Sequence, residues 1–81
     1  MLDELASVDD KIIQLILRKL NNTTLVYALA GTSGVVCKRF MDNLSGRMVS
    51  FLGAELEKNE FSAEKIKDAQ KAILQIYSMI K

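Results

Sequence analysis

The side chains best suited to act on another molecule are two opposite charges on one predicted helix, Arg47 and Glu55. They stand eight positions apart, which on an α-helix means about 80° of rotation and roughly 12 Å along the axis. A cation and an anion on one rigid element can engage a charged partner protein, but they do not make a catalytic centre. The alternative interpretation is that both are ordinary solvated charges.

The helix that must position these charges is predicted over residues 43–59. Its apolar residues recur at steps of three and four, which places them on one face toward a core: Met48, Phe51, Leu52 and Leu56. Ser45 is the expected N-cap. Gly53, in the middle, costs about 1 kcal/mol relative to alanine, and it either permits close packing or is a weak point.

The remaining segments predict helices with short turns between them. We expect Ser7 to cap a helix from Val8 to Leu20, and Asn21 or Asn22 to cap one from Thr23 to Ala30. Thr32 or Ser33 should cap a helix from Gly34 to Asn43, and Ser62 the last helix. No segment has the period of a strand. The sequence therefore predicts an all-α fold, a compact orthogonal array of about five short helices in a single domain over residues 1–81.

The apolar faces of these helices are expected to pack into one hydrophobic core, which contains Ile13, Ile16, Leu29, Phe40, Phe51, Leu52, Ile73 and Ile76. Lys38, Arg39 and Asp42 should face water. Leu2 and Leu5 either dock onto the core or belong to a frayed end. Cys37 lies on the Val36–Phe40 face, so we expect a buried and unreactive thiol rather than a reactive one.

Composition excludes several functions. The 81 residues are 49 % apolar and 26 % charged, which is typical of a soluble globular domain. Eleven basic and ten acidic residues give a net charge of +1, whereas a nucleic-acid binder is usually more basic, so a DNA-binding helical domain is the least favoured class. The longest apolar run, Leu25 to Ala30, is far shorter than the roughly 20 residues of a membrane span.

The residue types needed for catalysis or metal binding are scarce. Histidine is absent and Cys37 is the single cysteine, so neither a metal cluster nor an intrachain disulfide can be assembled. No glycine-rich phosphate loop follows a strand. We therefore expect no catalytic residue, no metal, no cofactor and no small-molecule substrate. The chain is predicted to be a non-enzymatic domain that works by contact.

Several stretches, in order and spacing together, resemble one known family: residues 9–18, 22–25, 28–31, 38–47 and 68–74. The chain, from about Leu2 to Ile80, resembles the C-terminal domain of the bacterial flagellar motor switch protein FliG. The resemblance implies a rotor component in the C ring of the flagellar basal body, at the cytoplasmic face of the inner membrane. It also implies that charges on a ridge helix meet the cytoplasmic loop of the stator protein MotA, transmit torque and set the direction of rotation. The other implied partners are FliM, neighbouring FliG copies, and FliF through the rest of the full-length chain.

This sequence matches only some of the charged ridge residues of the family. Arg47 aligns with the ridge arginine of the family, and Glu55 with the second of two adjacent acids. Ala54 replaces the first acid, and Ala30 stands where the family usually has a lysine. Near Ser62 the Pro-x-Arg segment of the family is shortened and its arginine is missing. Three ridge charges are therefore absent, which implies a divergent copy or paralogue.

Two functions follow from the resemblance. The first is a rotor–stator contact domain, which requires Arg47 and Glu55 to be exposed and clear of neighbours. The alternative is a structural or assembly module of the rotor ring with weakened or no stator coupling, which requires an exposed apolar patch around Leu2, Leu5 and Met79. Met1 falls where the hinge segment of the family would end, so we expect the chain to be a domain of a longer protein.

Overall fold

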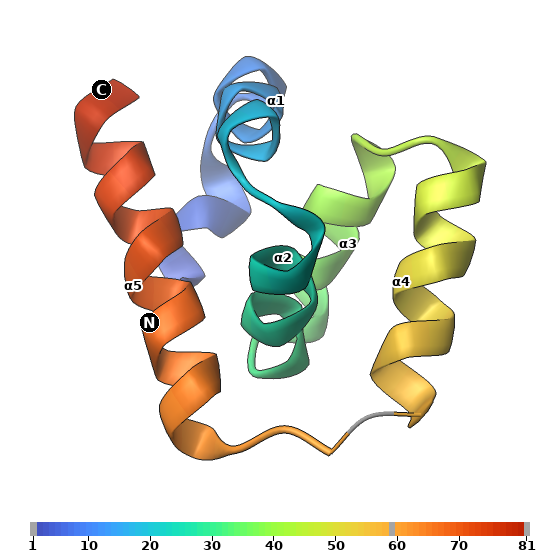
Figure 1. The fold of residues 1–81 in the computed structure, drawn as a ribbon. Helices are drawn as coiled ribbons and strands as arrows, with labels where there is room; N and C mark the ends of the chain where they lie inside the picture. The colour runs from blue at the N-terminus through green and yellow to red at the C-terminus, as the bar shows by residue number, and fades with distance from the viewer. Residues whose placement is uncertain (1, 59, 81) are drawn as a thin grey trace.

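Helices account for most of residues 2–58 and 60–80, the part of the chain that the computed structural model describes (Figure 1). In chain order they are a 3-10 helix and five α-helices: η1 (Asp3–Ser7), α1 (Asp10–Lys19), α2 (Asn22–Ala30), α3 (Gly34–Asp42), α4 (Gly46–Lys58) and α5 (Ala63–Ile80). The predicted all-α fold with about five helices is confirmed.

Each α-helix begins after a side chain that accepts a hydrogen bond from a backbone N–H in its first turn. The capping residues are Asp9, Asn21, Ser33, Ser45 and Ser62. The prediction that Ser7 caps the first helix is wrong, because Ser7 ends η1 and the chain then passes through extended backbone at Val8 and Asp9. The Oδ1 atom of Asp9 accepts from the N–H of Lys11 at 3.0 Å, so α1 begins two residues later than expected.

Helix α2 lies at the centre of the fold (Figure 1), with α5 packed on one side and α4 on the other. Its sequence is apolar nearly all round, which is the pattern of a helix covered by neighbours on several sides. Four of its nine residues are buried: Leu25, Val26, Ala28 and Leu29. Helix α1 packs against α5 and α3, and η1 packs against α3.

The predicted core is largely confirmed, with two differences. Six of the eight side chains are buried: Ile13, Ile16, Leu29, Phe40, Leu52 and Ile73. Ile76 is half-buried, and Phe51 is 40 % exposed. Leu52, the next residue, is fully buried. Because neighbouring residues on a helix diverge by about 100°, Phe51 falls at the edge of the stripe that Leu52 defines.

The N-terminal segment docks onto the core. Leu2 and Leu5 are 2 % and 0 % exposed, so the docking interpretation is confirmed for these two side chains. The exposed apolar patch that an assembly module would need around Leu2, Leu5 and Met79 is not formed. Met79 alone of the three is exposed.

The close contact between α2 and α5 depends on the glycine at position 31, which has no side chain. A Cβ atom at Gly31 would lie 2.4 Å from Cγ2 of Ile66 and 2.9 Å from Nε2 of Gln70, so a side chain there would clash with α5. Gly31 has an ordinary negative φ, and its role is therefore close approach and not backbone freedom. Gln70 is 7 % exposed, and its Nε2 donates to the carbonyl oxygen of Ala28 at 3.3 Å, which satisfies this buried amide.

Gly53 is in the opposite situation. A Cβ atom there would meet nothing within 4 Å, so this glycine permits no close packing and is the weak point of α4.

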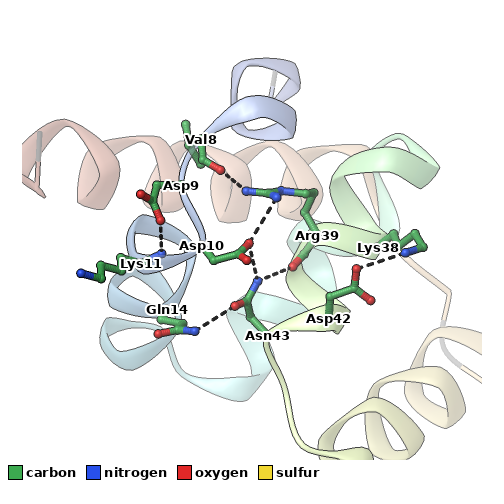
Figure 2. A network of polar contacts seen from close by, with 9 residues as sticks. All are labelled: Val8, Asp9, Asp10, Lys11, Gln14, Lys38, Arg39, Asp42 and Asn43. Atoms are coloured by element: carbon green, nitrogen blue, oxygen red, sulfur yellow. Dashed lines mark hydrogen bonds and ion pairs between the residues drawn. The ribbon is translucent and has the colours of Figure 1, made fainter.

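A polar network holds η1 and α1 against α3 (Figure 2). The guanidinium of Arg39 donates to the carbonyl oxygen of Val8 and lies 3.2 Å from Oδ1 of Asp10. Asn43, the C-cap of α3, donates to the carbonyl oxygen of Arg39 at 2.9 Å and accepts from Nε2 of Gln14 at 3.0 Å. The expectation that Arg39 faces water is wrong, because its side chain is only 28 % exposed.

Two neighbours of Arg39 do face water. Lys38 and Asp42 form an exposed ion pair of 3.1 Å along α3, as expected.

Cys37 is half-buried against the core, and burial raises the pKa of its thiol. Full burial was expected and is not found. Slow reaction with thiol reagents stays a prediction, and the raised pKa supports it because the thiolate is the reactive form.

Replacing Gly31 by alanine should destabilise the domain by about 1–3 kcal/mol, because the new methyl group pushes Ile66 and Gln70 away from α2. The matched control is Gly53→Ala, which adds a methyl group in open space within a helix and should stabilise by up to about 1 kcal/mol. Urea denaturation followed by circular dichroism measures both. Equal effects of the same sign would refute the packing role of Gly31.

Removing the guanidinium with Arg39→Ala should cost about 1–2 kcal/mol, since a charge-assisted hydrogen bond to a backbone carbonyl is lost together with a partly exposed ion pair. Lys38→Ala, on the adjacent residue, should change stability by no more than about 0.5 kcal/mol, because its ion pair is exposed. The same urea series compares them. A loss from Lys38→Ala as large as that from Arg39→Ala would show that the network does not anchor η1.

Candidate partner-contact surface

Arg47 lies in the first turn of α4 and is exposed. No hydrogen bond or ion pair joins its side chain to another residue in ranges 2–58 and 60–80. The N-terminus of a helix carries a partial positive charge, and the first turn of α4 holds no acidic residue. A cation at this position therefore opposes the stability of its own helix.

Glu55 lies two turns further along α4 and is half-buried. Its side chain is 24 % exposed, and its Oε2 atom lies 4.0 Å from Nζ of Lys58, whose side chain is 70 % exposed. A contact at this distance with a largely exposed partner adds little to stability. The expectation that both contact residues are exposed and clear of neighbours is met by Arg47 and is wrong for Glu55, because Glu55 is half-buried at the wall of a hollow and lies beside Lys58.

Glu55 lines a hollow of about 190 Å³ between α4, α2 and the segment before α5. Its apolar walls come from three aromatic rings and one valine: Tyr27, Phe51, Phe61 and Val26. The rings of Tyr27 and Phe61 meet edge to face with centroids 5.3 Å apart. Asn22 and Thr23, at the start of α2, complete the lining.

Sequence reasoning did not find this hollow, for a physical reason. Tyr27, Phe51 and Phe61 lie on three separate segments, so no local spacing links them. The available signal was the position of Phe51 beside Leu52, which allows only one of the two to sit at the centre of the buried face.

The other three predicted ridge positions are spread over the fold. Ala54 is exposed on α4, next to Glu55. Ala30 is half-buried at the end of α2, and Ser62 is exposed and caps α5. None of the three carries a charge, so the described surface presents Arg47 and Glu55 as the only charges at the predicted ridge positions.

Other kinds of site are not supported within the described residues. No three side chains of His, Cys, Asp or Glu in ranges 2–58 and 60–80 gather where they could hold a metal ion. None of the helices in that part of the chain is long and apolar enough to cross a membrane. Fold and surface together define an all-helical domain that carries both charged candidate contact residues on α4.

Comparison with known proteins places the domain in a family. The family model for the FliG C-terminal domain matches residues 1–80. The chain belongs to this family. The flagellar motor switch protein FliG of Pseudomonas aeruginosa is 37 % identical over 75 residues, which cover 91 % of this chain and 22 % of the relative.

Two further relatives carry the same name. FliG of Buchnera aphidicola is 32 % identical over 75 residues, covering 91 % of this chain and 23 % of the relative. FliG of Thermotoga maritima is 30 % identical over 79 residues, which cover 98 % of this chain and 23 % of the relative. The chain thus spans less than a quarter of the length of these relatives.

The position of Arg47 leads to a stability prediction. Arg47→Glu should stabilise the domain by about 0.3–1 kcal/mol, because it replaces a cation by an anion at a helix N-terminus. Lys11→Glu is the matched control, since Lys11 is also exposed and is the second residue of its helix. Thermal unfolding at low salt measures both. If Arg47→Glu destabilised while Lys11→Glu did not, Arg47 would hold a stabilising contact and could not be a solvated charge.

Proposed function

We propose that this chain is the stator-facing domain of a flagellar rotor switch protein and that it acts by contact and not by catalysis. Family membership over residues 1–80 carries the proposal. In this role Arg47 and Glu55 of α4 meet opposite charges on the cytoplasmic loop of the stator protein MotA, which transmits torque and sets the direction of rotation. The full-length protein would bind FliM, neighbouring FliG copies and FliF, at the cytoplasmic face of the inner membrane.

The placement of Arg47 supports this role. A cation in the first turn of a helix opposes the helix dipole, and Arg47 gains no compensating contact within the described residues. A residue that breaks a local rule of stability without compensation is expected at functional positions. Charges of this kind steer encounter and set register more than they add affinity.

A second candidate function rests on the missing charges. Ala30, Ala54 and Ser62 leave three ridge positions neutral, which favours a structural module of the rotor ring with weakened or no stator coupling. The apolar patch expected for such a module is not formed, because Leu2 and Leu5 are buried. We therefore rank this function second.

Charge reversal tests the contact role. Arg47→Glu and Glu55→Lys in the full-length protein should each reduce swimming and alter rotation, because opposite charges across the interface become like charges. Each contact should be worth no more than about 1 kcal/mol, so the defects should be partial and should change with ionic strength. Swimming in soft agar and rotation of tethered cells measure the effect.

The controls use the same substitutions at comparable exposed positions. Glu57→Lys changes an exposed acid on α4, and Lys11→Glu changes a cation with the same place in α1. Both should swim like the parent, and circular dichroism should show that all four variants fold. If Arg47→Glu and Glu55→Lys fold and also swim like the parent, the contact role is refuted and the assembly role takes its place.

A further inference from the structure

The hollow beside Glu55 has the shape of a socket for one side chain. Its volume of about 190 Å³ is below the roughly 300–1,000 Å³ of sites for small-molecule ligands. Phe51 is 40 % exposed there, although it is a large apolar residue. Tyr27 and Phe61 hold each other edge to face, so this wall is formed before any ligand arrives.

The chain segment beside the hollow is acidic overall. Residues 55–65 carry four acids, Glu55, Glu57, Glu60 and Glu64, and two bases, Lys58 and Lys65, a net charge of −2 in a chain whose total is +1. Of the two bases, Lys65 places its Nζ atom 5.8 Å from the centroid of the Tyr27 ring. At neutral pH, Glu55 is the only lining residue that carries a charge. The Oε2 atom of Glu55 lies 4.0 Å from Nζ of Lys58, and because the Lys58 side chain is largely exposed, this ion pair adds little to stability.

We propose that this hollow binds a segment of a partner protein in which an aliphatic or aromatic side chain stands within one helical turn of a lysine or arginine. The apolar side chain would enter between Phe51 and the Tyr27–Phe61 pair, and the cation would meet Glu55. Half-buried Glu55 lies in a medium of lower polarity than water, where a charge pair is stronger than on an open surface.

The proposal gives the contact an apolar anchor in addition to its charges. Anchors that fill preformed aromatic sockets supply most of the affinity of small interfaces, and charges at their edge set orientation. This inference rests on the proposed contact role of Glu55, and it adds Phe51, Tyr27 and Phe61 as the residues that hold the partner in place.

The test titrates the isotope-labelled 81-residue chain with a defined probe and follows backbone amide shifts by NMR. The probe is an acetylated and amidated octapeptide with one phenylalanine and one arginine three positions apart among glycine and serine. Saturable shifts are expected at amides of Val26, Tyr27, Phe51, Glu55 and Phe61. Peptides with serine in place of phenylalanine, or glutamate in place of arginine, should bind about tenfold more weakly or not at all.

Variants locate the site. Phe51→Ala and Glu55→Gln should each lower the affinity for the probe about tenfold. Val35→Ala and Glu57→Gln should leave this affinity within about twofold of that of the parent. The controls remove an apolar side chain of α3 that is more exposed than Phe51, 62 % against 40 %, and a nearby acid of α4. Because Phe51 is partly exposed, Phe51→Ala should still fold, and Phe51→Leu provides a second variant that keeps an apolar wall and partial binding.

Two results would overturn the proposal: no saturable shifts at the named amides, or equal weakening by Glu57→Gln and Glu55→Gln, which would indicate diffuse attraction to the acidic segment. These results differ from failure of the proposed function, which shows as normal swimming of the charge-reversal variants. Binding in the socket together with normal swimming would leave the socket intact and remove its role in rotation.

Discussion

The close contact of α2 with α5 at Gly31 is the constraint on which the arrangement of the helices depends. There the backbone of one helix end lies against the side chains of Ile66 and Gln70, with no space for a methyl group between them. Gln70 adds a buried hydrogen bond to the same end of α2. This pairing fixes α2 at the centre, and α4 then packs on the side of α2 that α5 leaves open (Figure 1).

The polar network around Arg39 fixes the arrangement of the helices in the N-terminal half of the chain. It ties the segment before α1 and the first turn of α1 to the last turn of α3, from which the chain turns into α4 (Figure 2). Helix α4 itself has a single buried residue, Leu52. Seven of the thirteen residues of this helix, which carries the candidate contact residues, are exposed.

Much of the fold could be predicted from the sequence because the determining signals are local. The serine caps at 45 and 62 follow from residue type, and the stripes of Ile13, Ile16 and Ile73 follow from spacing, whereas residue type narrows the cap of α3 only to Thr32 or Ser33, and it is Ser33. The inward turn of Arg39 could not be predicted, because its carbonyl partner is 31 positions away. The socket beside Glu55 was missed for the same reason, since its walls meet only after α2 and α4 have packed.

The cation at the start of α4 has a consequence for the history of the sequence. Its helix would be more stable with an acid or a neutral residue there, so folding alone gives no reason to keep arginine at position 47. Under the proposed contact role, a copy of the domain that no longer acts in a motor would be under selection for stability alone at this position and would lose the cation. On that proposal, the residue at position 47 distinguishes copies that act in a motor from copies that do not.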